Sequence, residues 1–203
     1  MTTETPKRAP NLARLLDRLG YTVEAGWLDA GDFHRSSTHR LALEQAMREM
    51  AVVGAFCLKR RVGLIETVAT PLVYVASAAN KGRIKEIHRK VWSQGLAPFL
   101  IVFTSDHLAI CPGFSYSDQD WDGHVRWFTW ADVDALPLSH AELGGLGDRL
   151  NDLLNLCALR LRTSLFWRDH AIDVTGRVDR RLLDNLDALS SVLIRGLGVS
   201  GPI

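Results

Sequence analysis

The sequence predicts an α/β fold, in which a mixed central sheet is flanked by helices and followed by a C-terminal helical segment. Short apolar runs rich in β-branched and aromatic residues predict strands at residues 52–58, 62–68 and 98–104. Apolar residues at helical spacing predict a helix over residues 81–95, between two of these strands. Leucines at helical spacing then dominate the last third of the chain. Strands that alternate with helices indicate the α/β class.

Two helices are predicted before the first strand. In the first, Pro10 begins the helix, Gly20 ends it, and leucines share one face between them. The second helix runs to about Met50, with N-cap candidates at Ser36, Ser37 and Thr38. Its apolar face consists of Leu43, Ala46, Met47 and Met50.

The runs at 52–58 and 62–68 predict a hairpin, with the charged residues Lys59, Arg60 and Arg61 as its turn. A third run follows Pro71 at residues 72–76. Because this run is apolar without interruption, we expect a strand buried on both faces of the sheet.

The helix predicted over residues 81–95 has two distinct faces. Gly95 is placed to cap its C-terminus, and His88, on the apolar face, is expected to be a hydrogen-bonded core residue. Residues 98–104 and 108–111 predict a second hairpin, and residues 115–130 a long loop or an edge strand. The apolar face consists of Ile84, Ile87, Val91 and Trp92. The other face carries Lys81, Lys85 and Arg89.

The C-terminal third is predicted to be helical. One face contains Leu150, Leu153, Leu154, Cys157 and Leu161, and a second contains Leu182, Leu186, Leu189 and Leu193. We therefore expect an α/β domain over residues 1–135 and a helical connector over residues 136–203 that continues into a larger protein.

Composition restricts the class of protein. The apolar fraction of 47% and charged fraction of 23% are typical of a folded globular chain. No apolar run is long enough for a membrane span and the N-terminus lacks a secretory signal, so we expect a cytoplasmic protein without a membrane partner. Residues 1–113 contain 15 Lys or Arg against 10 Asp or Glu. This basic half suggests a polyanionic partner such as DNA.

The order of helix, hairpin, buried strand and second helix is also the arrangement of metal-dependent nucleases of the PD-(D/E)XK type. Their chemistry requires two acidic residues that hold Mg²⁺ and a lysine near the attacking water. Glu44 and Glu66 are weak candidates for the acids, with Lys59 or Lys85 as the lysine. Leu72 follows Pro71 where an aspartate is expected, and the strand ends at Val75, Ala76 and Ser77 without an acid or a lysine. We therefore predict a degenerate core. Solvated or paired surface carboxylates are the simpler interpretation of Glu44 and Glu66.

Basic residues of the predicted turn and helix form a second candidate site. If they share one surface, they can neutralise the phosphates of DNA without reading its bases. A solvated helix surface is the alternative. The proposed DNA-binding residues are Lys59, Arg60, Arg61, Lys81, Lys85 and Arg89.

Histidine and tryptophan residues give weaker signals. Two Asp-His pairs, at Asp106 and Asp169, lack any accompanying nucleophile or metal motif. The tryptophans of residues 121–130 can stack a base, although anchoring of a loop is the commoner role. No glycine-rich phosphate loop or other cofactor motif is present, so we expect no cofactor in this segment.

Two segments carry a resemblance to a known family. The run IHRKVWSQGLAPFLIVFTSDHLAICPGF, residues 87–114, resembles the N-terminal region of bacterial adenine-specific DNA methyltransferases of type IIG-like restriction-modification or phage-defence systems. The run FWRDHAIDVTGRVDRRLLDNLDALSSVLI, residues 166–194, resembles the helical connector of those proteins. The resemblance implies S-adenosylmethionine and an adenine-binding loop for the parent protein, beyond residue 203.

The leading hypothesis is therefore a non-catalytic, DNA-engaging or scaffolding domain at the N-terminus of a site-specific adenine DNA methyltransferase. The first rival is an active Mg²⁺-dependent DNA endonuclease domain. The second is a protein-protein interaction module whose leucine-rich C-terminal helices bind a partner subunit.

Overall fold

The structure is a computed structural model that describes residues 10–35, 39–62, 66–136, 148–162 and 186. Its strands are β1 (Trp27–Asp29), β2 (Val52–Val62), β3 (Glu66–Ser77), β4 (Phe99–Phe103), β5 (His107–Pro112) and β6 (Arg126–Thr129). Its α-helices are α1 (Pro10–Leu19), α2 (Arg40–Met50), α3 (Lys81–Gln94), α4 (Trp130–Asp134), α5 (Asp148–Asn155) and α6 (Ala158–Leu161). Two short 3-10 helices are η1 (Ala30–Arg35) and η2 (Asp122–His124).

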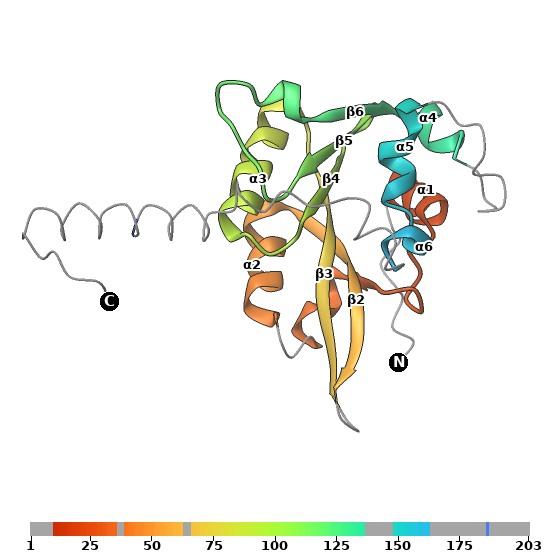
Figure 1. Cartoon of the computed structure of the whole chain (residues 1–203), viewed down its shortest axis with the longest axis vertical. Helices are drawn as coiled ribbons and strands as arrows, with labels where there is room; N and C mark the ends of the chain where they lie inside the picture. The colour runs from red at the N-terminus through yellow and green to blue at the C-terminus, as the bar shows by residue number, and fades with distance from the viewer. Residues whose placement is uncertain (1–9, 36–38, 63–65, 137–147, 163–185, 187–203) are drawn as a thin grey trace, which may run out of the picture.

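The strands form one mixed sheet in the order β1-β2-β3-β4-β5-β6. Strands β3 and β4 are parallel, and α3 connects them, whereas the other neighbouring strands are antiparallel. The predicted α/β class and the predicted mixed sheet with flanking helices are confirmed (Figure 1).

Helices cover both faces of the sheet because the central strands are apolar on both faces. On one face, Val73 and Ile101 pack in a cluster with residues of α1, α4, α5 and α6. On the other face, Tyr74 and Leu100 pack in a second cluster with residues of α2 and α3. The prediction that residues 72–76 are buried on both faces is therefore confirmed.

The predicted turn at Lys59, Arg60 and Arg61 is wrong. These residues continue β2, opposite Ala69, Val68 and Thr67 of β3. Their charge is typical of a turn, but the antiparallel pairing with β3 holds their backbone in a strand.

Residues 66–68 of the first predicted strand and residues 72–76 of the second belong to one strand, β3, which runs through Pro71. Proline lacks an N–H donor, so it is tolerated in a strand only at an edge or a bulge. Both conditions are met here. The register with β2 shifts between Phe56 and Cys57, next to Pro71, and the pairing with β4 begins only at Val73.

Local sequence signals position α3. The side chain of Asn80 accepts a hydrogen bond from the backbone N–H of Arg83, which caps the N-terminus. Gly95 adopts a left-handed conformation with φ of 64° and caps the C-terminus, as predicted. In α2 the predicted apolar face is correct except for Met47, which is 38% exposed because one helical step rotates it away from Ala46.

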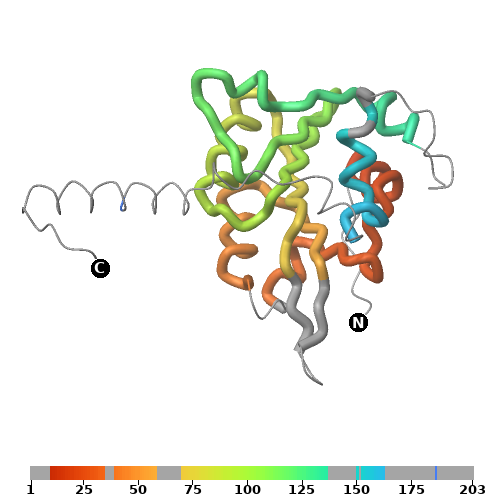
Figure 2. The backbone as a smooth tube through the Cα atoms, in the orientation of Figure 1, coloured from red at the N-terminus to blue at the C-terminus, as the bar shows by residue number. Residues whose placement is uncertain are grey.

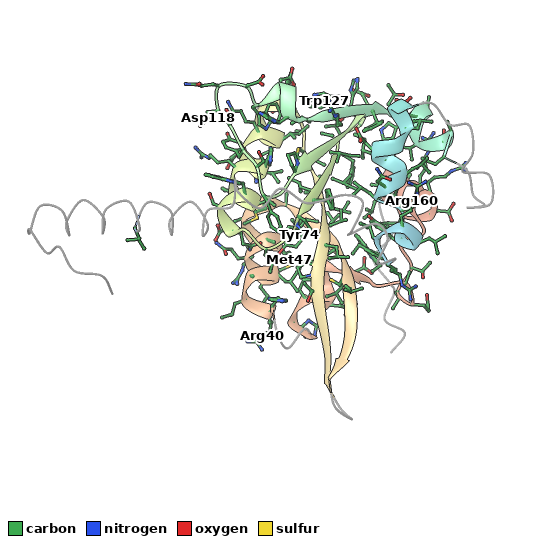
Figure 3. All side chains as sticks on the ribbon, in the orientation of Figure 1. Arg40, Met47, Tyr74, Asp118, Trp127 and Arg160 are labelled. Carbon is green, nitrogen blue, oxygen red and sulfur yellow. The ribbon has the colours of Figure 1, made fainter. Side chains whose placement is uncertain are left out.

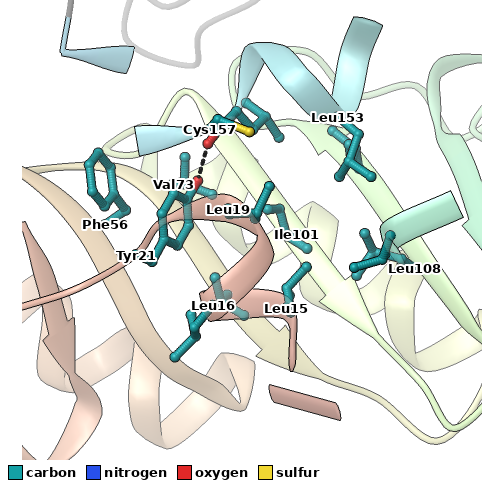
Figure 4. Close-up of a cluster of buried hydrophobic side chains, with 14 of the residues drawn as sticks. Leu15, Leu16, Leu19, Tyr21, Phe56, Val73, Ile101, Leu108, Leu153 and Cys157 are labelled. Carbon is teal, nitrogen blue, oxygen red and sulfur yellow. Dashed lines mark hydrogen bonds between the residues drawn. The ribbon is translucent and has the colours of Figure 1, made fainter. Parts of the chain in front are cut away.

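Helices α5 and α6 pack on the α/β core. Leu153, Leu154 and Leu161 belong to the same buried cluster as Val73 of the sheet. The hydroxyl of Tyr21 donates a 2.6 Å hydrogen bond to the carbonyl of Leu156 (Figure 4). The core therefore extends beyond residue 135, and these leucines are used inside the domain. The second leucine face, at Leu182 to Leu193, lies outside the described residues except for the exposed Leu186.

Candidate nucleic-acid interface

The outer halves of β2 and β3 form a two-stranded ribbon that extends beyond the rest of the sheet (Figure 1). Strand β1 pairs with β2 only as far as Phe56, and β4 pairs with β3 only from Val73. Leu58–Val62 therefore have no third strand beside them, over a length of about 17 Å. We call this segment with its partner, residues 66–70, the β2–β3 ribbon.

The ribbon contains three consecutive cationic residues, Lys59, Arg60 and Arg61. Their register partners on β3 carry no acidic side chain, and Glu66 is paired with Val62 at the outer end. A two-stranded ribbon fits the major groove of B-DNA. The ribbon thus combines a two-stranded shape with three consecutive cationic residues.

The structure separates the predicted basic residues into two groups. Arg61 lies opposite Thr67, near the start of β3, whereas Lys81 follows the end of β3 at Ser77. Ten residues of strand separate Thr67 from Ser77, which corresponds to about 33 Å. The predicted single surface of ribbon and helix is therefore two surfaces.

On α3, acidic side chains of one loop neutralise two of the predicted cations. Lys81 Nζ lies 2.8 Å from Asp122 Oδ1, and Lys85 Nζ lies 3.1 Å from Asp118 Oδ1. We call residues 116–122 the acidic loop, and Figure 2 shows the chain between β5 and β6 passing beside α3. Figure 3 labels Asp118 on this loop and Trp127 on β6. Lys81 and Lys85 are therefore already paired with carboxylates of the protein.

The electrostatics of the acidic loop agree with its contacts. Hydrogen bonds from Tyr116, and then from Lys85, hold the pKa of Asp118 below its ordinary value. A hydrogen bond from Lys81 lowers the pKa of Asp122 in the same way. Both carboxylates are therefore ionised over the ordinary pH range.

The remaining cations of α3 differ in their pairing. Arg83 and Lys90 both pair with Glu86, and the hydrogen bond from Arg83, followed by that from Lys90, lowers the pKa of Glu86 to about 2. Arg89 is exposed and forms no ion pair with the residues that the structure describes.

His88 fixes the acidic loop to α3 from inside the protein. Its side chain is fully buried, as predicted. Nε2 lies 2.8 Å from the carbonyl of Pro112 and 3.1 Å from that of Ser115, and Nδ1 lies 2.9 Å from Nε1 of Trp121. Because an indole nitrogen only donates, Nδ1 is the acceptor and Nε2 carries the proton. Burial lowers the pKa of His88 and keeps the ring neutral.

The tryptophans of this region anchor the loop and its neighbours. Trp121 and Trp130 are buried, and Trp130 Nε1 donates to the carbonyl of Ser105. Trp127 Nε1 donates to Asp122, and Lys81 lies over the rings of Trp121 and Trp127. The indole N–H groups thus bond to protein atoms, which favours the anchoring role over base stacking.

The weak nuclease candidates do not form a metal site. Glu44, on α2, pairs with Arg40 at 3.4 Å and with Arg48 at 3.5 Å. Glu66 lies at the outer end of the ribbon, six residues before Leu72 and about 20 Å from it along β3. Among the described residues, no group of three or more His, Cys, Asp or Glu side chains is placed to hold a metal ion.

The strand positions that a nuclease would use are apolar. Leu72 is buried in the cluster with α1, and Ala76 is buried in the cluster with α2 and α3, on the opposite face. Neither side chain can bind Mg²⁺, which requires oxygen ligands. The residues present do not fit a metal at this position.

A crevice of about 480 Å³ lies at the carboxyl ends of β3 and β4. Its walls include Asn80, Lys81, Asp106, His107 and Trp127. Thr104 Oγ1 accepts hydrogen bonds from the backbone N–H groups of Asp106 and His107, so this Asp-His pair forms the β4–β5 turn. The pair at Asp169 and His170 lies outside the described residues.

In comparisons with known proteins, no family model, curated protein or solved structure matches the chain. Within the described ranges, no helix has the length and apolar character needed to cross a membrane.

Sequence reasoning did not predict the ion pairs between α3 and the acidic loop. One signal was present: Lys81 and Lys85 are four residues apart, and so are Asp118 and Asp122. Two oppositely charged segments with the same spacing of charges can pack side by side. Only the fold brings these two segments together.

Proposed function

We propose that this chain engages duplex DNA through the β2–β3 ribbon without cleaving it. The observation that carries the proposal is the ribbon itself, which projects beyond the sheet and contains Lys59, Arg60 and Arg61 in sequence. Cations in this position neutralise DNA phosphates, and the two strands match the width of the major groove.

In this proposal the domain has a degenerate restriction-nuclease-like core. The order α2, β2–β3 hairpin, α3 and β4 supports this finer description, because the hairpin and buried strand lie between two helices. The apolar residues Leu72 and Ala76, together with the pairing of Glu44 to two arginines, support a non-catalytic role over the Mg²⁺-dependent nuclease.

The domain would serve as the N-terminal DNA-engaging or scaffolding part of a site-specific adenine DNA methyltransferase. The support is the resemblance of residues 87–114 and 166–194 to such proteins. S-adenosylmethionine would then bind in the remainder of the longer chain, and no described residue is assigned to it.

The test is the affinity of the protein for a fluorescein-labelled DNA duplex, measured by fluorescence anisotropy at low salt. The triple variant Lys59→Gln, Arg60→Gln, Arg61→Gln should bind more weakly, with unchanged circular dichroism. A matched control is Arg48→Gln, Arg126→Gln, Arg162→Gln, which removes three exposed charges outside the ribbon and α3. Equal weakening in both variants would mean that net charge, and not the ribbon, determines binding.

A further inference from the structure

The acidic loop places carboxylates along α3 at the same interval as the lysines. Lys81 pairs with Asp122 and Lys85 pairs with Asp118, so the loop runs antiparallel to the helix. On the helix, the residues are about 6 Å apart along the axis. Arg89 extends the row by another turn and lowers the pKa of Asp118 through its charge, as a smaller contribution than the hydrogen bonds.

Contacts of His88 and Trp92 also hold the loop against α3. His88 bonds to the carbonyls of Pro112 and Ser115 and to the indole of Trp121, and Trp92 stacks on Tyr116 at 5.6 Å. The carboxylates are exposed, 68% for Asp118 and 59% for Asp122. Exposed ion pairs contribute little to stability, because water screens their charges. The two ion pairs therefore neutralise charge on the α3 surface but contribute little to the stability of the protein.

Carboxylates and phosphates bind lysine by the same chemistry, a charge-assisted hydrogen bond to oxygen. The Lys81 side chain is 58% exposed and the Lys85 side chain is 37% exposed. Both side chains are thus partly accessible from solvent while the loop is in place. Lys85 Nζ also donates a 3.1 Å hydrogen bond to the backbone carbonyl of Asp118. A phosphate can reach the two ammonium groups if the carboxylates no longer occupy them.

We propose that Lys81, Lys85 and Arg89 form a second phosphate-binding surface for duplex DNA, which Asp118 and Asp122 occupy in the free protein. The acidic loop is then an intramolecular competitor of DNA. This inference deepens the proposed DNA-binding function and rests on it for the identity of the partner.

The experiment removes the competitor in a protein whose ribbon has lost its three cationic residues. The Lys59→Gln, Arg60→Gln, Arg61→Gln variant receives Asp118→Asn and Asp122→Asn, and duplex binding is measured over a range of NaCl concentrations. Two new phosphate contacts should steepen the plot of log affinity against log salt by about 1.8. Adding Lys81→Gln and Lys85→Gln should abolish the gain.

The matched control is Asp17→Asn with Asp152→Asn, which changes the net charge equally and leaves the acidic loop intact. Asp17 is exposed on α1, and Asp152 of α5 is 51% exposed and lies 3.3 Å from Arg126. If the control produces the same gain, or if the lysine substitutions do not reverse it, the inference is wrong. Circular dichroism tests whether the variant with all five substitutions is folded. If it is unfolded, Asp118→Asn alone, in the same triple-glutamine background, should steepen the plot of log affinity against log salt by about 0.9. An unchanged slope would contradict the inference.

The two proposals fail in different ways. If the ribbon does not bind DNA, the wild-type protein and its ribbon variant bind equally, but removal of Asp118 and Asp122 still produces binding that depends on Lys81 and Lys85. If α3 is not a phosphate-binding surface, ribbon-dependent binding remains and the aspartate substitutions add nothing beyond the control.

Discussion

Nε1 of Trp121 donates a 2.9 Å hydrogen bond to Nδ1 of His88 in the interior of the protein. The same ring bonds through Nε2 to two backbone carbonyls, so both ring nitrogens have partners. This arrangement joins η2, the end of β5 and α3. It also requires a neutral ring, because a protonated Nδ1 would face the indole N–H.

Replacing Trp121 with Phe should destabilise the protein. The substitution leaves the buried Nδ1 of His88 without a donor, which costs about 1–3 kcal/mol. Urea unfolding measures the change. Trp127→Phe is the control, because its indole bonds to the exposed Asp122 and its loss should cost less. Equal losses of stability in the two variants would mean that the hydrogen bond to His88 contributes no more than the bond to Asp122.

Stability should fall as the medium becomes mildly acidic. Burial lowers the pKa of His88 below its ordinary value of 6.5, so the unfolded chain binds the proton more readily than the folded chain. The free energy of unfolding should depend little on pH near about pH 7.5. It should then decrease as the pH falls below the unfolded value, approaching a slope of about 1.4 kcal/mol per pH unit.

Chemical unfolding of the wild type and of His88→Gln between about pH 7.5 and about pH 5 tests this slope. The variant should be less stable and nearly independent of pH in this window. The lowered pKa values of Asp118 and Glu86 have their effect only at more acidic pH. A flat profile for the wild type would show that His88 is not held in its neutral form.

Replacing Tyr21 with Phe should weaken the packing of α5 and α6. Phenylalanine keeps the stacking on Phe56, whose ring centroid is 4.4 Å away, but leaves the carbonyl of Leu156 without its donor. We expect a loss of about 1–3 kcal/mol in the free energy of unfolding. Tyr116→Phe is the control, because its hydroxyl bonds to the exposed Asp118. A smaller loss for Tyr21 than for Tyr116 would be inconsistent with docking of this segment on the core.

The protein should not cleave DNA when a divalent metal is added. Leu72 and Ala76 provide no oxygen ligand, and Glu44 is paired with Arg40 and Arg48. Supercoiled plasmid incubated with Mg²⁺ or Mn²⁺ should remain supercoiled. Nicking by the wild type that disappears in Glu44→Gln would establish the nuclease instead.

A ribbon in the major groove should protect guanine N7, which lies in that groove. Dimethyl sulfate footprinting should show reduced methylation with the wild-type protein, and no protection with the variant that lacks the charges of Lys59, Arg60 and Arg61. Protection of N7 that persists in this variant would place another part of the protein in the groove.

The elements with local signals were predictable from the sequence. Pro10 and Gly95 marked helix boundaries, and the apolar spacing in α1 and α3 predicted the buried residues except for Trp92, which is half-buried. Lys59–Arg61 were assigned to a turn because consecutive charges are typical of turns. Their strand conformation depends on the pairing with β3, which no local signal showed.

The candidate site was less predictable than the fold. The sequence identifies each cationic residue. Whether a lysine is available to bind a phosphate depends on which side chain the fold places beside it. Lys81 and Lys85 form ion pairs with Asp122 and Asp118, which are distant in the sequence. The buried His88 holds the two segments together through its hydrogen bond to Trp121. Such contacts are tertiary, so composition and periodicity do not reveal them.

The salt dependence of duplex binding tests the central claim most directly, because its slope counts the phosphates that the protein neutralises. The claim predicts steep salt dependence for the wild type. If each of Lys59, Arg60 and Arg61 contacts a phosphate, the slope should be shallower by about 2.7 in the triple glutamine variant. The same slope in both proteins, or binding that does not respond to salt, would contradict a role of the ribbon in DNA binding.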